Sequence, residues 1–227
     1  MKKVFKCMLL CVMAVALMTS SVFAASFTDI ENHWAENYIE QMAEKGYVKG
    51  YGDGTFNPDG PMTRAEVATV LSNVFGLPNT NAGHKVLKDV KENDWFMPYT
   101  LVGYLVFPPE KEDIYTFRGN DEITRVEAAH AIIALYNCTA STGYATDMAD
   151  YDTFKDDSFV KKVVSTAVKY KIMQGKGKTG FEPFSTLTRA ELCTLIMRTI
   201  ENKGNADEGT IKTLCDFINQ VNEKYGK

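Results

Sequence analysis

The stretch Thr63-Arg64-Ala65-Glu66 returns as Thr124-Arg125-Val126-Glu127 and again as Thr188-Arg189-Ala190-Glu191 in this chain of 227 residues. Each copy follows a loop and precedes an apolar run with helical spacing. A Thr followed three residues later by Glu is a capping box, in which each side chain accepts a hydrogen bond from the other residue's backbone amide. Three helices are therefore predicted to begin at these points.

The arginine inside each copy is not explained by helix stability. A cation in the first turn faces the positive end of the helix dipole, which disfavours it by about 0.3–1 kcal/mol. A residue that opposes the helix at three equivalent places indicates another role. Arg64, Arg125 and Arg189 are therefore the first candidates for a binding site.

The beginning of the chain predicts export. Met1-Lys2-Lys3 precedes an apolar run that reaches Val22-Phe23-Ala24, a pattern typical of a signal peptide cleaved after Ala24. Leu10 before Cys11 argues against lipoprotein processing. Removing residues 1–24 takes three of the 25 basic residues and none of the 29 acidic ones, leaving a net charge of 22 − 29 = −7. We therefore expect no nucleic-acid partner, and no later apolar run is long enough for a transmembrane segment.

A longer repeat surrounds the three motifs. The first copy contains Phe27-Thr28-Asp29, Trp34-Ala35 and the loop Gly50-Tyr51-Gly52-Asp53-Gly54-Thr55-Phe56-Asn57-Pro58 before its capping box. The later copies keep parts of this order. Corresponding residues are assigned as Asp29, Asp89 and Asp156; Trp34 and Trp95; and Gly50, Gly52 and Gly175.

The repeats predict an all-α fold. Each unit has the pattern of a helix, a loop and a second helix, and about 50 residues are too few to bury a convincing core alone. Three helix-loop-helix units are therefore expected to close on one another as a pseudo-threefold helical bundle. After Gly204 a C-terminal amphipathic helix is predicted, which either packs on this body or offers a docking surface to another protein. Its apolar face would contain Ile211, Leu214, Cys215, Ile218, Val221 and Tyr225.

In their order and spacing, these motifs resemble the S-layer homology modules. The resemblance implies three tandem modules, at residues 26–76, 86–137 and 153–203, between the signal peptide 1–24 and a tail at 204–227. It also implies non-covalent binding to a secondary cell wall polymer that bears pyruvylated N-acetylmannosamine, in grooves between modules. The chain would then be a secreted protein of the cell wall or S-layer of a Gram-positive-type envelope.

The chemistry of the repeated residues suits such a ligand. A pyruvyl ketal carries a carboxylate, which the planar fork of an arginine can bind through two hydrogen bonds. Free amides at the same helix start would add donors. The grooves that use Arg64 and Arg189 are expected to be the most effective, and the groove of the second module, which lacks the glycine-rich loop, to be misshapen. The proposed glycan-binding residues are Arg64, Arg125, Arg189, Asp29, Asp89, Asp156, Trp34, Trp95, Gly50, Gly52 and Gly175.

The same residues also have structural interpretations. Asp29 could cap the first helix or pair with Arg64, Trp34 could belong to the core, and the loop glycines could only form turns. The acidic residues in the loop 53–59 lack the spacing and the closing glutamate of a calcium loop, so no metal site is predicted.

An enzymatic function is not predicted, and neither is a cofactor. The three histidines are not accompanied by a nucleophile elbow, a Cys-His pair, a metal-binding cluster or a phosphate loop. His130 and Cys193 lie in apolar helical runs and are expected in the core. The remaining alternative is an envelope interaction protein, which binds other proteins and has little or no affinity for glycan.

Overall fold

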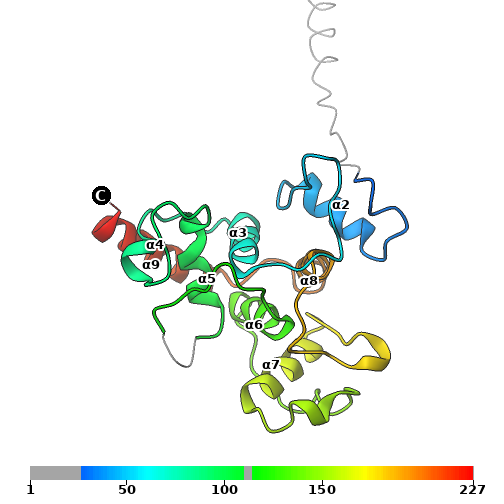
Figure 1. The fold of residues 1–227 in the computed structure, drawn as a ribbon. Coiled ribbons are helices and arrows are strands. Elements are labelled where there is room, and N and C mark those ends of the chain that lie inside the picture. Colours follow the sequence, from blue (N-terminus) through cyan, green and yellow to red (C-terminus); the bar gives the residue numbers. More distant parts are fainter. Residues whose placement is uncertain (1–26, 110–113, 227) are drawn as a thin grey trace, which may run out of the picture.

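A computed structural model describes residues 27–109 and 114–226 (Figure 1). The predicted signal peptide, residues 1–24, lies outside them. Within these ranges every regular element is a helix, which confirms the predicted all-α class. The α-helices are α2 (Glu36–Glu44), α3 (Arg64–Phe75), α4 (Gly83–Val86), α5 (Thr100–Val106), α6 (Arg125–Leu135), α7 (Ser158–Lys169), α8 (Arg189–Lys203) and α9 (Glu208–Tyr225). The short 3-10 helices are η1 (Met97–Tyr99), η2 (Tyr151–Thr153) and η3 (Gly177–Thr179).

Each predicted capping box is present at the start of a second helix. At α3, the Thr63 hydroxyl accepts a hydrogen bond from the Glu66 amide at 3.3 Å, and the Glu66 carboxylate accepts one from the Thr63 amide at 2.8 Å. Helices α6 and α8 begin in the same way at Thr124 and Thr188. Gly76 ends α3 in the left-handed conformation, with φ of 63°, as expected for a C-terminal cap.

Helices of different repeats pair in cyclic order (Figure 1). The second helix of each repeat packs against the first helix of the next: α3 against α5, α6 against α7, and α8 back against α2. Since one unit cannot bury enough apolar surface by itself, each repeat completes its core with a neighbour's helix. The result is one hydrophobic core that continues through all three repeats. Its buried side chains include Ile39, Leu71, Leu101, Ile132, Val164 and Leu195.

A closed ring of backbone hydrogen bonds joins the three repeats just before their second helices. Met62 N donates to Leu187 O at 3.0 Å, Leu187 N donates to Ile123 O at 2.9 Å, and Ile123 N donates to Met62 O at 2.9 Å. All three side chains are buried. The backbone amides and carbonyls of these three residues are therefore hydrogen-bonded within the protein, as buried backbone groups require.

The amides at the helix starts are also taken by the protein. Arg64 N donates to Asp121 O at 2.9 Å, and Ala65 N donates to Gly119 O at 3.0 Å, both in the second repeat. The next amide in the turn donates to the Thr63 hydroxyl. The amides that begin α6 and α8 have equivalent carbonyl acceptors. The prediction that free amides at these helix starts would bind an anion is therefore wrong, because the neighbouring repeat already uses them.

The C-terminal helix α9 packs back on the body. Ile218 and Val221 are buried, whereas Tyr225, predicted on the same face, is 40% exposed. The Asn222 side chain binds the linker between the first two repeats: its Oδ1 accepts from Thr80 Oγ1 at 2.7 Å, and its Nδ2 donates to Asn79 O at 2.9 Å. None of the helices in the described ranges is both long enough and apolar enough to cross a membrane.

The substitution Asn222→Ala is expected to lower the free energy of unfolding by about 1–3 kcal/mol, because it leaves the buried Thr80 hydroxyl without its acceptor. Urea denaturation measures this change. Asn219→Ala is the matched control, since Asn219 is exposed on the same helix. Equal stability of the two variants would contradict the role assigned to Asn222.

Candidate functional site

The repeated arginines connect neighbouring repeats. In each case the guanidinium Nε donates to the backbone carbonyl of a buried phenylalanine in the next repeat. The arginine of the third repeat reaches the first, so these contacts form a second closed cycle. The pairs are Arg64 with Phe117 at 2.8 Å, Arg125 with Phe181 at 2.9 Å, and Arg189 with Phe56 at 2.8 Å.

Two of the arginines also pair with the capping-box glutamate of the next repeat. Arg64 Nη1 contacts Glu127 Oε1, and Arg125 Nη1 lies 2.8 Å from Glu191 Oε1. Arg125 Nη2 further donates to Gln174 O at 3.1 Å. Arg64 and Arg125 are 2% and 3% exposed, and cations so deeply buried need a paired carboxylate. Each of these glutamates therefore caps its own helix through one oxygen and neutralises an arginine through the other.

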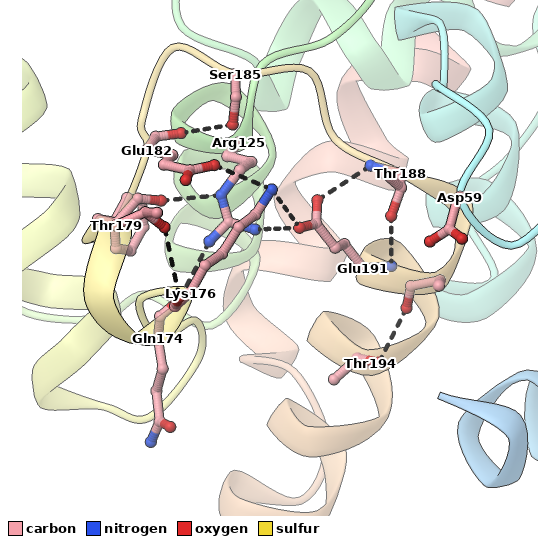
Figure 2. A network of polar contacts seen from close by, with 12 residues as sticks. Asp59, Arg125, Gln174, Lys176, Thr179, Glu182, Ser185, Thr188, Glu191 and Thr194 are labelled. Atoms are coloured by element: carbon pink, nitrogen blue, oxygen red, sulfur yellow. Dashed lines mark hydrogen bonds and ion pairs between the residues drawn. The ribbon is translucent and has the colours of Figure 1, made fainter. Parts of the chain in front are cut away.

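Figure 2 shows the polar network around Arg125. Lys176 Nζ lies 3.0 Å from Glu191 Oε1 and 3.2 Å from Glu182 Oε2. A hydrogen bond from Thr179, together with the Lys176 cation, holds the pKa of Glu182 below its ordinary value. Two cations and two carboxylates thus compensate one another at this site.

Aspartates hold the loop that each arginine contacts. Asp29 accepts hydrogen bonds from the amides of Phe56 at 2.8 Å and Asn57 at 2.6 Å. Asp89 and Asp150 do the same in the second and third repeats. Neither structural alternative considered for Asp29, a helix cap or a partner for Arg64, describes this role.

The assignment of Asp156 as the third member of this set is wrong. Asp150 bonds the loop, while Asp156 is exposed and accepts no hydrogen bond from the described residues. Asp150 precedes Gly175 by 25 residues, whereas Asp29 precedes Gly50 by only 21. Because this segment is longer in the third repeat, the sequence comparison assigned Asp156 in place of Asp150. The third unit therefore includes residues before the predicted boundary at 153.

The aspartates also stabilise an unfavourable backbone conformation. The residue after each phenylalanine has a left-handed backbone without being glycine: φ is 56° at Asn57, 57° at Arg118 and 55° at Glu182. A Cβ atom disfavours this region. Two consecutive amides directed at one carboxylate offset that cost, so the first role of these aspartates is to fix the loop.

The three glycines proposed to let a ligand approach the backbone differ in whether the fold leaves room for a side chain. A Cβ atom on Gly50 would lie 2.6 Å from Thr55 O, and one on Gly175 would lie 2.8 Å from Gly180 O. Both positions therefore require glycine because the loop folds tightly on itself. A Cβ on Gly52 would meet nothing within 4 Å, so no steric reason for glycine exists there.

A cavity of about 530 Å³ opens beside the Arg125 network. Three cationic side chains line it, from Arg125, Lys176 and Arg198. Trp34 of the first repeat also lines it and is 60% exposed, so the alternative that this tryptophan belongs to the core is wrong. All three repeats contribute to the cavity, and Asp59, Gly175 and Thr194 are among its other lining residues.

Two further cavities differ from this one. The cavity at Arg64 measures about 240 Å³ and is lined by Phe107, Pro108 and Pro109, which replace the glycine-rich loop in the second repeat. Its small size agrees with the expected distortion and does not favour the Arg64 groove as one of the most effective. The other cavity, of about 570 Å³, lies between α9 and the aromatic side chains of Tyr47, Phe75 and Tyr136.

The corresponding aromatic residues of the other two repeats do not line the cavity beside Arg125. Trp95 is 58% exposed and lines none of the three cavities described above. Phe159 occupies the corresponding place in the third repeat, and the centroid of its ring lies 5.3 Å from that of the His130 ring. Only the first repeat therefore places this aromatic side chain in the cavity beside Arg125.

The histidine and cysteine in the apolar helices are buried or nearly so. Burial lowers the pKa of His130, whose ring binds Val106 O at 3.1 Å. Burial raises the pKa of Cys193 to about 12, which keeps the thiol protonated and unreactive. Residues 27–109 and 114–226 contain no group of three or more His, Cys, Asp or Glu side chains that could hold a metal ion.

The contribution of Asp29 to stability is expected to depend on pH. Burial alone would raise the pKa of Asp29, but the hydrogen bonds from Phe56 and Asn57 outweigh it and hold the pKa below 3.8. The stabilisation is therefore fully present above the unfolded-state pKa and is lost as the pH falls through the lower folded-state value. Thermal unfolding should show Asp29→Asn less stable than wild type at pH 6, with the difference shrinking below pH ~3.8. Asp156→Asn is the control, and the same pH-dependent difference in that variant would contradict the assignment.

Removal of the Arg125 side chain should destabilise the whole body. Arg125→Met leaves the Phe181 and Gln174 carbonyls without their donor and Glu191 with a single cation, and we expect a loss of about 3 kcal/mol in urea denaturation. Arg198→Met, at an exposed arginine, should change stability by less than about 0.5 kcal/mol. Similar stabilities would show that the contacts of Arg125 contribute little.

Comparison with known proteins agrees with this architecture. The model of the S-layer homology domain matches residues 26–68 and 151–193. The amylopullulanase of Thermoanaerobacterium thermosulfurigenes is 30% identical over 185 residues, the S-layer protein sap of Bacillus anthracis 29% over 223, and the cellulosome-anchoring protein of Acetivibrio thermocellus 40% over 67.

These similarities cover 79%, 94% and 30% of this chain, but only 10%, 26% and 15% of the respective relatives. The chain thus spans about a quarter or less of the length of these proteins. Residues 26–68 and 151–193 are S-layer homology domains, and the chain belongs to that family.

Proposed function

We propose that this chain attaches to the cell wall without a covalent bond, by binding an acidic secondary wall polymer in the grooves between its repeats. The names of its relatives support this role, since they include S-layer proteins and a cellulosome-anchoring protein. The chain would then act at the cell surface as a binding protein and not as an enzyme. The resemblance suggests pyruvylated N-acetylmannosamine as the sugar.

The observation that carries the proposal is the cavity of about 530 Å³ beside Arg125. Its volume lies in the range of small-molecule sites, and it combines cations with an exposed tryptophan. A sugar ring presents an apolar face that can stack on Trp34. Its hydroxyl groups can bond the polar atoms of Lys176 and Thr194. A flat aromatic surface beside hydrogen-bonding groups suits the binding of a carbohydrate.

We also propose that the middle repeat, residues 86–137, is a third module of the same family. It has the capping box of the matched segments, and Asp89 bonds its loop as Asp29 and Asp150 bond theirs. Its Phe117 carbonyl accepts from Arg64 as the equivalent carbonyls do. The irregular segment that replaces the glycine-rich loop accounts for the lack of a match at this repeat.

The packing of α9 argues against the alternative of a free docking helix. Ile218 and Val221 of this helix are buried against the body, and Asn222 binds the linker at residues 79–81. A partner protein would have to displace these contacts. Glycan binding by the repeats is therefore the better supported function.

Co-sedimentation with purified Gram-positive wall sacculi tests the proposed function. We expect the purified protein to pellet with intact sacculi and to remain in solution after hydrofluoric acid has removed the secondary polymers. Pelleting that is unaffected by this treatment would exclude the polymer as the ligand.

The variant Trp34→Ala tests the cavity itself. Because Trp34 is exposed, the fold should be kept while the sugar-stacking surface is lost, and we expect at least tenfold weaker binding, equivalent to about 1.4 kcal/mol. Tyr144→Ala, at a comparably exposed aromatic residue outside the described cavities, should bind normally. Equal loss in both variants, or in neither, would place the binding site elsewhere.

A further inference from the structure

The three cations that line the cavity beside Arg125 differ in whether the protein compensates their charge. Arg125 Nη1 and Lys176 Nζ lie 2.8 and 3.0 Å from Glu191 Oε1, and Lys176 Nζ also lies 3.2 Å from Glu182 Oε2. The third cation, Arg198, is exposed and forms no ion pair with the residues that the structure describes. Its positive charge is therefore available to a ligand in this cavity.

Helix α8 places Arg198 in the cavity wall. The lining residues Glu191, Thr194, Leu195 and Arg198 recur three or four positions apart along α8, so they share one face of the helix. Glu191 and Thr194 lie on successive turns (Figure 2), and Arg198 lies one turn further along the same face. At 1.5 Å per residue, its Cα is about 10 Å along the axis from that of Glu191. The uncompensated cation is thus separate from the Arg125 network.

An aromatic ring of the first repeat holds the Arg198 side chain. Helix α8 packs against α2, and the central carbon of the Arg198 guanidinium lies 5.8 Å from the centroid of the Tyr38 ring. Glu201, three residues further along α8, accepts a hydrogen bond from the Tyr38 hydroxyl at 3.4 Å and forms no ion pair with Arg198 in the described part of the chain. A neutral ring therefore positions this cation without cancelling its charge.

Arg198 is particular to the third repeat. It follows Arg189 by nine residues, and the equivalent positions of the other two second helices are occupied by Asn73 and Ala134. Two repeats of the same architecture fold without a cation at this point of the helix. The shared fold therefore does not require Arg198, and only one such cation is expected per chain.

A ligand carboxylate meets different conditions at the two kinds of cation. At Arg125 or Lys176 it would have to compete with Glu191, whose side chain is 11% exposed and bonded to both. At Arg198 no carboxylate of the described residues has to be displaced, and the planar fork of a guanidinium can bind a carboxylate through two hydrogen bonds. The acidic group of a ligand is therefore better served at Arg198.

We propose that Arg198 is the residue by which the cavity beside Arg125 selects an acidic sugar over a neutral one. Its guanidinium binds the carboxylate, while the sugar ring stacks on Trp34, which lines the same cavity from the first repeat. This inference rests on the proposed wall-polymer function and adds the residue that determines its specificity. The Arg125 network then shapes the cavity and offers hydrogen bonds to neutral hydroxyl groups.

Titration calorimetry with two sugars tests this role: the methyl glycoside of pyruvylated N-acetylmannosamine, and the same glycoside without the ketal. Wild type should bind the ketal sugar at least tenfold more tightly, with one such site per chain. Arg198→Gln should bind both sugars with similar affinity, because only the contact with the carboxylate is lost. Arg198→Lys, which keeps the charge without the planar fork, should retain part of the preference. Lys178→Gln is the control, since Lys178 is an exposed cation of the third repeat that lines none of the described cavities.

A ketal preference that persists in Arg198→Gln would overturn the inference, because the carboxylate would then lie elsewhere. Equal weakening of both sugars would also overturn it, since it would assign Arg198 a general role. In wild type, the Nε–H resonance of Arg198 should shift with the ketal sugar and not with the neutral one; its failure to shift is decisive even if the variant binds neither sugar. If the ketal sugar does not bind while sacculi still pellet the protein in a polymer-dependent way, the role of Arg198 is wrong and the proposed function stands.

Discussion

The ring of backbone hydrogen bonds among Met62, Ile123 and Leu187 is the constraint on which the rest of the structure depends. It brings the starts of the three second helices together, so the amides of each start meet carbonyls of the neighbouring repeat. The same closure lets each second helix pack against the next repeat's first helix. A repeat on its own would have neither its hydrogen-bond partners nor a complete core.

The closure of the three repeats changes whether an arginine in the first turn of a helix is favourable. In an isolated helix, a cation in the first turn is disfavoured. In the assembled protein, that cation lies beside a backbone carbonyl of the next repeat, and at Arg64 and Arg125 beside a glutamate as well. The repeated arginine is therefore first a connection between repeats, and its availability to a ligand depends on whether a partner carboxylate is present.

Features set by neighbouring residues could be predicted from the sequence, whereas those set by distant residues could not. The capping boxes depend on residues a few positions apart, and they are confirmed. The partner of Arg64 lies 63 residues away, and its glutamate already had a sufficient local role as a cap. Asp150 was missed because the segment that follows it is longer than in the first repeat. The exposure of Trp34 depends on how the first and third repeats meet, which periodicity does not reveal.

The pairing of α8 with α2 also has a consequence for biosynthesis. Helix α2 belongs to the first repeat to leave the ribosome, yet its partner α8 belongs to the last. Contacts between segments so far apart in the chain form late, because a long loop must close before they can be made. Helix α2 therefore gains its native partner only after residues 189–203 have been synthesised.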